Sequence, residues 1–176
     1  MHPRTAELSE LLDRTRADLR AAVATVPLDA GQRRPPSGVW CPAEIVDHLN
    51  IVESRVGRLL GRLLDQAGPL PRRGDAASAL SSLDEYRLLD RSIRVPGPEG
   101  VQPSPAANLS VAMAELEQAR RALHALLARV DGLDTERIRA PHPLFGPLSL
   151  EQWMVFLAQH EARHTAQLRE VVAALT

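Results

Sequence analysis

Two histidines near the C-terminal end of the sequence, His160 and His164, have the spacing of metal ligands on a helix. They lie in the stretch QHEARHTAQL, residues 159–168, where HEARH matches the His-Glu-x-x-His pattern of zinc metalloproteases. Residues four positions apart on a helix share one face, with Cβ atoms about 5–6 Å apart. Because two imidazoles at this spacing can bind one metal ion, the segment predicts part of a metal site.

A metalloprotease of this class needs a third ligand downstream, either a Glu or the His of the extended metzincin pattern. After His164 the sequence contains no further His or Gly, and its only acid is the nearby Glu170. The third ligand is therefore expected upstream, and peptide hydrolysis is not favoured. Glu161, which matches the general base of the protease pattern, is a candidate catalytic residue, with a solvated position at the rim of the site as the alternative.

His48 is the natural third ligand, because it lies on the apolar stripe of another predicted helix. A single inward histidine is ordinarily a hydrogen-bonded core residue. Three of them would each need a polar partner in an uncharged core, and joint binding of a metal ion supplies one. Burial keeps the imidazoles neutral, and three His ligands leave a coordination position open, as in catalytic sites.

The elements that must position these histidines are helices. Ala and Leu are abundant, Val, Ile, Thr and aromatic residues are sparse, and apolar residues recur at spacings of three and four. Capping boxes mark two helix starts, at Cys41 with Glu44 and at Ser149 with Gln152. We expect an all-α fold with four long helices over residues 5–26, 42–64, 105–130 and 150–175.

The second and third helices are separated by a connection rich in Pro, Gly and Arg, residues 66–104, in which SSLDEYRLLDRS predicts one short helix. No strand is expected, and His142 is assigned to a loop before the last helix. The chain, residues 1–176, is thus predicted to be a single domain, a four-helix bundle with a long crossover connection. In such bundles, cofactor sites are built from side chains on facing helices.

Composition narrows the choice of partners. The net charge is −1 and no stretch approaches the ~18 uninterrupted apolar residues of a membrane span, so neither nucleic acid nor a membrane is an expected partner. The chain has one cysteine, and its first residues, MHPRTAELSELL, lack the apolar core of a signal peptide. We expect a cytoplasmic protein with a small-molecule or protein partner.

Two blocks of the sequence resemble the DinB-like, or YfiT-like, metalloproteins. WCPAEIVDHLNIVE looks like the family's Trp-x-Pro-x-Glu-x-x-x-His-Leu motif, and HPLFGPLSLEQWMVFLAQHEARHTAQL is similar to its Phe-Gly-x-Leu loop and His-x-x-x-His helix. Cys41 departs from the Ser more often found at that helix start. The resemblance implies a four-helix bundle, frequently a homodimer, in which one His of the second helix and two of the last hold a divalent ion, often zinc or nickel. The matching residues here are His48, His160 and His164.

The resemblance is compatible with several activities, because members of this family differ in the reactions they catalyse. Some members transfer low-molecular-weight thiols such as bacillithiol, mycothiol or glutathione, or use one in isomerisation, others are described as metal-dependent hydrolases, and many have no known reaction. Our first hypothesis is a metal-dependent transfer of such a thiol to a small electrophile. The alternatives are a small-molecule hydrolase and a non-catalytic metal-binding stress protein. Arg55 and Arg163 are candidate binding residues for thiol carboxylates, with solvated surface arginines as the alternative. Gln167 is a candidate partner of a ligand imidazole, with an ordinary surface residue as the alternative.

Overall fold

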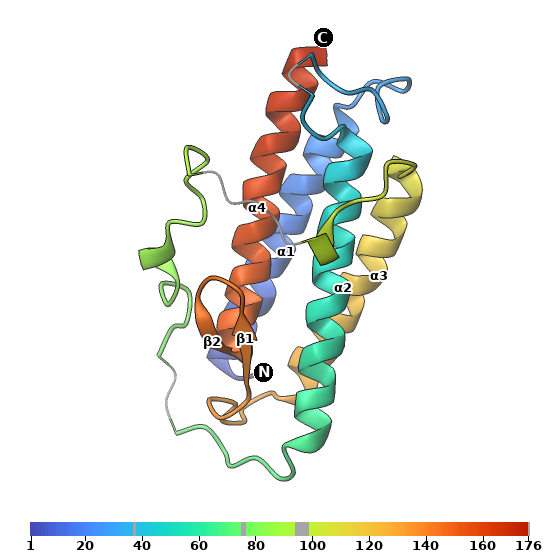
Figure 1. The fold of residues 1–176 in the computed structure, drawn as a ribbon. Coiled ribbons are helices and arrows are strands. Elements are labelled where there is room, and N and C mark those ends of the chain that lie inside the picture. Colours follow the sequence, from blue (N-terminus) through green and yellow to red (C-terminus); the bar gives the residue numbers. More distant parts are fainter. Residues whose placement is uncertain (37, 75–76, 94–98, 176) are drawn as a thin grey trace.

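Four long helices form the body of the molecule, with α1 and α4 running in one direction and α2 and α3 in the other (Figure 1). The computed structural model describes residues 1–36, 38–74, 77–93 and 99–175. Helix α1 packs along α4 and α2 along α3, while α2 and α4 also contact each other. The predicted all-α four-helix bundle is confirmed, with the long connection between the second and third helices. The helix bounds are Pro3–Ala24 for α1, Pro42–Gln66 for α2, Leu109–Arg129 for α3 and Leu150–Leu175 for α4.

Both predicted capping boxes are present. The backbone N–H of Cys41 donates to the Glu44 carboxylate at 2.9 Å at the start of α2. Before α4, the N–H of Ser149 donates to Gln152 Oε1 at 3.0 Å, and the N–H of Gln152 donates to Ser149 Oγ at 3.3 Å. Helix α3 begins later than predicted, because the Asn108 side chain accepts from the first backbone N–H groups and caps the helix there.

The expectation of a fold without strands is wrong at one place. Strands β1, Arg139–His142, and β2, Gly146–Ser149, form an antiparallel hairpin that leads directly into α4. Gly146 has a φ of 73°, a left-handed conformation that favours glycine, where the chain enters β2. The predicted short helix of the connection is reduced to a 3₁₀ turn, η1, Asp84–Tyr86; a second, η2, Glu99–Val101, precedes α3.

The apolar core consists of two main clusters at successive levels of the bundle, each with side chains from all four helices. The cluster near the hairpin includes Leu12, Leu60, Leu123 and Met154, and the other includes Leu19, Ile45, Leu116 and Leu168. Along each helix a buried charged or histidine residue lies between the two levels. Within the described ranges, no helix is long and apolar enough to cross a membrane.

Candidate metal centre

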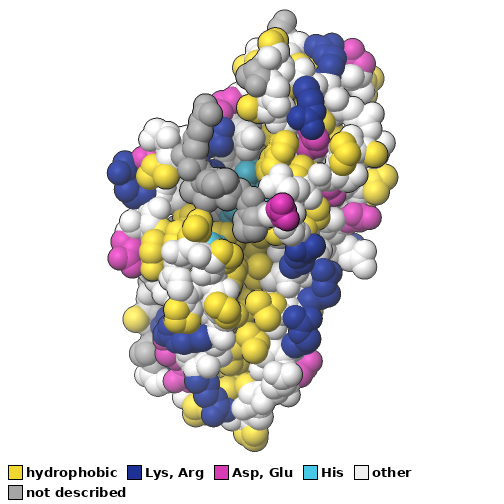
Figure 2. All heavy atoms as spheres, in the orientation of Figure 1, with side chains coloured by type: hydrophobic (Ala, Val, Ile, Leu, Met, Phe, Trp, Pro, Cys, Tyr) yellow, Lys and Arg dark blue, Asp and Glu magenta, His cyan; other side chains and the backbone are white. Residues whose placement is uncertain are grey.

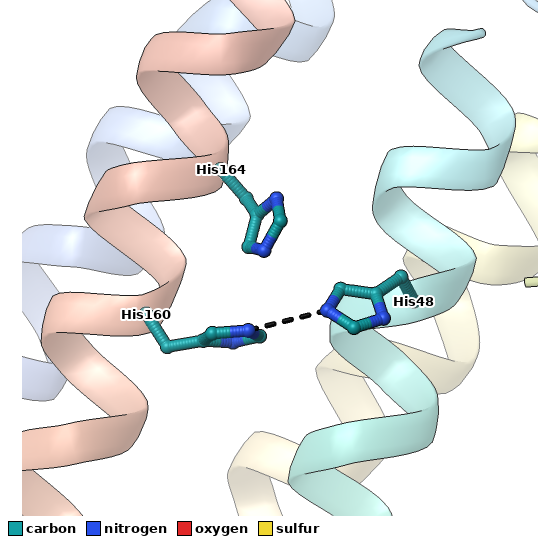
Figure 3. A group of neighbouring side chains, drawn as sticks. All are labelled: His48, His160 and His164. Carbon is teal, nitrogen blue, oxygen red and sulfur yellow. Dashed lines mark hydrogen bonds between the residues drawn. The ribbon is translucent and has the colours of Figure 1, made fainter. Parts of the chain in front are cut away.

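Three histidines from two facing helices converge at one point in the bundle (Figure 3). His48 projects from α2, and His160 and His164 project from α4 one turn apart. One ring nitrogen of each lies within 4.8 Å of the others, and the Nε2 atoms of His48 and His160 are 3.2 Å apart. Two nitrogen ligands of a tetrahedral zinc ion, at bond lengths of about 2.0–2.1 Å, are roughly 3.3 Å from each other. The donor set therefore fits a divalent metal.

Hydrogen bonds at the far side of two rings orient them for this role. His48 Nδ1 lies 2.7 Å from the carbonyl oxygen of Val101, and His164 Nδ1 lies 2.7 Å from Gln167 Oε1. Because both partners are acceptors, each Nδ1 carries the proton and each Nε2 keeps its lone pair. The contact of Gln167 is one of the two interpretations that its spacing allowed, the other being an ordinary surface residue. The contact of Val101 was not predicted, because a backbone carbonyl of a distant turn has no sequence signal.

Burial keeps the three imidazoles uncharged. It lowers the pKa of His164 to about 3 and holds the pKa of His160 well below its usual value, with the neighbouring imidazoles adding to the effect. Burial also lowers the pKa of His48, whose side chain is 3% exposed. All three are therefore neutral near pH 7, the protonation state that a metal ligand needs.

Aromatic side chains surround the histidines. Trp40 lies 4.8 Å from His48 between ring centroids, and Phe156 stacks on His160 at 5.3 Å. The sequence has only two Trp, one Tyr and two Phe, and ring contacts join all five to the histidine cluster directly or through one another. Figure 2 shows histidine side chains reaching the surface among hydrophobic ones. The site thus has an apolar border.

His142 belongs to this aromatic group and not to the cluster of His48, His160 and His164. Its ring lies parallel to that of Phe145 at 4.3 Å and also contacts Trp153 and Phe156. The backbone N–H of Leu144 donates to His142 Nδ1 at 3.2 Å. Burial lowers the pKa of His142 to about 4, so this ring is also neutral near pH 7.

Glu161 lies in a buried ionic network instead of in the histidine cluster. Its Oε2 accepts hydrogen bonds from Arg16 Nη2 at 2.8 Å and from Arg120 Nη2 at 2.9 Å. Glu53 pairs with the same two arginines, at 3.1 Å from Arg16 Nη2 and 2.9 Å from Arg120 Nε. We call these four side chains the Arg–Glu quartet. All four residues are at most 3% exposed, and each comes from a different helix.

The quartet engages one carboxylate oxygen, Oε2, of the Glu that completed the protease pattern, while its Oε1 is buried and has no hydrogen-bond partner among the described residues. Among the described residues, the group of potential metal ligands holds His48, His160 and His164 and includes no carboxylate. The sequence could not reveal this use of Glu161, because Arg16 and Arg120 are far from it along the chain. Their inward position on α1 and α3 was the available signal, since a buried arginine requires an acidic partner.

The two arginines predicted near the site have different surroundings. Arg163 donates to the backbone carbonyls of Leu88, Asp90 and Ile93, and so fastens the connection to α4. Arg55 is exposed and lines a cleft beside the connection. The contacts of Arg163 favour a structural role for it, whereas those of Arg55 leave its guanidinium available to a ligand.

Comparison with known proteins agrees with the family resemblance of the sequence and with the observed fold. A sequence model described as the DinB superfamily matches residues 11–168. The uncharacterized protein YuaE of Bacillus subtilis (strain 168) is 27% identical over 143 residues, which cover 79% of this chain and 81% of that protein. The crystal structure of TT2238, a four-helix bundle protein, matches with a TM-score of 0.63 and 22% identity, covering 94% of this chain and 98% of that one. This last likeness shows the shared fold.

Proposed function

The chain belongs to the DinB superfamily, and from this membership and the geometry of the histidines we propose that it binds one divalent transition-metal ion, zinc or nickel. The ligands are the Nε2 atoms of His48, His160 and His164. The observation that carries the proposal is the convergence of three neutral imidazoles from two helices, two of them held by acceptors that leave Nε2 free.

We further propose that the site transfers a low-molecular-weight thiol to a small electrophile. A divalent ion with an open coordination position lowers the pKa of a thiol held there. The thiol sulfur forms a bond to the electrophilic carbon, the leaving group departs with its bonding electron pair, and the thiol proton passes to solvent. The chain contributes orientation through its histidines, and Trp40 and Phe156 limit the access of water.

Two features favour the thiol reaction over the alternatives. A hydrolase with a protein base needs a carboxylate near the attacking water, and among the described residues none joins the histidine group. A storage or structural site closes its coordination sphere with a fourth protein ligand, and Glu161, the nearest acid in sequence, is held by Arg16 and Arg120. A thiol needs neither group, because the bound ion itself favours its deprotonation.

The metal assignment is tested by elemental analysis of protein loaded with zinc or nickel and then dialysed. The parent chain should retain about one ion, and the His48→Ala and His164→Ala variants, folded by circular dichroism, should retain almost none. His124→Ala is the matched control, because His124 lies away from the site with Ser9 and Asp13. Equal metal content in all four proteins would refute the assignment.

The reaction is tested separately with metal-loaded protein, monochlorobimane as electrophile, and a panel of bacillithiol, mycothiol and glutathione. Metal-dependent conjugation with at least one thiol is expected. Turnover of an ester or amide panel without any thiol conjugation would favour the hydrolase. Metal binding with no turnover of either kind would favour the non-catalytic protein.

Three further proposals come from the sequence. We propose a homodimer, which the family resemblance implies and which light scattering on a size-exclusion column tests. We propose a cytoplasmic location from the single cysteine, testable by fractionation of the source cells. The substrate is proposed to be a small molecule.

A further inference from the structure

A cleft of about 330 Å³ lies on the surface between α2 and the end of the connection. Two of its lining residues are arginines and none is acidic. Figure 2 shows basic side chains gathered on this part of the surface, below the histidines. The lining residues are Asn50, Ile51, Ser54, Arg55 and Arg58 from α2, with Gly100 and Gln102 from the connection.

The two arginines of the cleft differ in their partners from the arginines that stabilise this fold. Arg16 and Arg120 pair with buried glutamates, and Arg163 donates to three backbone carbonyls. Among the described residues, neither Arg55 nor Arg58 has an ion-pair or hydrogen-bond partner. Three positions apart on a helix, their side chains share one side of α2, where like charges repel each other. A bound anion would relieve this repulsion.

The cleft is joined to the histidine site by the residue whose carbonyl orients His48. Val101 stands between two lining residues, Gly100 and Gln102, and its oxygen lies 2.7 Å from His48 Nδ1. Arg55 lies two turns beyond His48 on the same helix, a rise of about 10 Å. A small molecule that contacts both the histidines and the arginines would need a charged group about 10 Å from its reactive group.

Gly100 permits the position of the Arg55 guanidinium. A Cβ atom added at Gly100 would lie 2.8 Å from Arg55 Nη1, closer than real Cβ contacts allow. The guanidinium therefore lies directly against the backbone of the connection. A side chain at position 100 would displace Arg55 without removing its charge, because the clashing atom is at the end of a flexible side chain.

We propose that this cleft binds the anionic group, a carboxylate or a phosphate, of the substrate that reacts at the histidines. The inference rests on the proposed function and narrows its substrate class to anionic small molecules of about 10 Å reach. Arg55 and Arg58 supply the charge-assisted hydrogen bonds, and Gly100 supplies the room. Small neutral thiols would lack this contact.

The test uses S-methylglutathione, which has two carboxylates but no free thiol, and isothermal titration calorimetry with both metal-free and zinc-loaded protein. The Arg55→Gln/Arg58→Gln double variant should bind it roughly tenfold more weakly or worse, as expected for the loss of charge-assisted hydrogen bonds. Gly100→Ala should also weaken binding. Arg62→Gln, an exposed arginine of α2 outside the cleft, should leave the dissociation constant unchanged.

Two chemical controls complete the design. The diethyl ester of S-methylglutathione, which lacks the carboxylates, should bind the parent as weakly as the acid binds the double variant. Phenyl phosphate distinguishes a phosphate from a carboxylate as the bound group. If the parent binds phenyl phosphate more tightly than S-methylglutathione, and the double variant loses this binding, the cleft is assigned to phosphate. The proposal is overturned if neither anion binds the parent, if the ester binds as well as the acid, or if the double variant binds both anions like the parent.

The outcome is separable from that of the proposed function. S-methylglutathione has no thiol to react, and its affinity for metal-free protein reports on the cleft alone. If the histidine variants keep their metal or no thiol is conjugated, the proposed function fails while the anion affinities still decide the cleft. If conjugation proceeds equally well with 2-mercaptoethanol and glutathione, and the double variant binds S-methylglutathione normally, the cleft fails while the proposed function stands.

Discussion

The carboxylate of Glu161 accepts a hydrogen bond from Arg16 at 2.8 Å, and this contact joins α4 to α1 beside the histidine site. Glu161 directly follows His160, so the same turn of α4 presents an imidazole to the histidine cluster and an acid to the bundle interior. The contact fixes the rotation of α4 about its own axis. We infer that the Glu of HEARH positions the helix that carries two of the histidines.

Replacing Glu161 by Gln is expected to destabilise the protein. Removal of one charge from a buried ion pair leaves its partners uncompensated, at a cost of about 3–5 kcal/mol in the free energy of unfolding. Urea unfolding of metal-free protein measures the change. Arg169→Gln is the matched control, because Arg169 also links α4 to α1, through Asp18, but both side chains are about half exposed. It should cost about 1 kcal/mol or less. A Glu161→Gln variant of parental stability with no activity would instead support a catalytic base.

Metal binding should stabilise the folded chain. An ion that binds the native state alone adds about 2.7 kcal/mol when present at a hundred times its dissociation constant. Zinc or nickel should therefore raise the melting temperature of the parent in differential scanning calorimetry, and a chelator should reverse the rise. His160→Ala should show no such response. A rise of equal size in that variant would mean that the ion binds elsewhere.

Gln167 should set the affinity for the metal without being a ligand. Its Oε1 accepts from His164 Nδ1, and loss of such an orienting partner typically lowers metal affinity about 10–100-fold. Gln167→Leu is expected to show this loss in a competition titration with a chromophoric chelator. Gln167→Glu, which keeps an acceptor at the same place, should retain the parental affinity or exceed it. Equal affinities in the two variants would exclude the orienting role.

Arg163 should hold the connection against α4. Its guanidinium donates to three backbone carbonyls of residues 88–93, and hydrogen bonds to charged groups contribute about 1.5–3 kcal/mol each. In Arg163→Met, hydrogen exchange should become faster in this segment and remain parental in α1 and α3. Arg91→Gln, which breaks a more exposed contact with Glu170 on the same segment, should have a smaller effect. Unchanged exchange in Arg163→Met would contradict the structural role.

His142 should make the fold sensitive to acid. Burial lowers its pKa from 6.5 to about 4, so between these values the unfolded chain binds a proton that the folded chain does not. The free energy of unfolding therefore falls as pH decreases from 6.5 to about 4. His142→Phe removes this contribution and keeps a ring beside Phe145. Between pH 7 and 4.5 the parent should lose more stability than the variant in urea titrations; equal losses would mean that His142 does not contribute.

Several features were predictable from the sequence because their causes are local. The spacing of apolar residues indicates which face of each helix is turned toward the core. The capping boxes at Cys41 and Ser149 depend on side chains only three residues away. The same helical period put His160 and His164 on one face. The identification of His48 required only that its helix face the last one, which the bundle architecture provides.

The hairpin was missed for the opposite reason. Residues 139–149 contain three prolines and no run of alternating apolar residues, so no strand pattern is visible. The pairing of Arg139–His142 with Gly146–Ser149 depends on a glycine with positive φ and on packing beneath α4, including the hydrogen bond from Trp153 Nε1 to the carbonyl of Ala140. This contact also brings His142 into the aromatic group.

The sequence by itself determined the helices, their inward faces and the three histidines, because helical geometry relates residues that are three or four apart. Only the tertiary structure decided the partners of those residues. Glu161 looks like a catalytic base in HEARH and is in fact paired with Arg16 and Arg120, whose positions in the chain carry no mark of the pairing. Buried charges must be neutralised by whichever side chain the packing brings near, and that choice is made between helices, not within them.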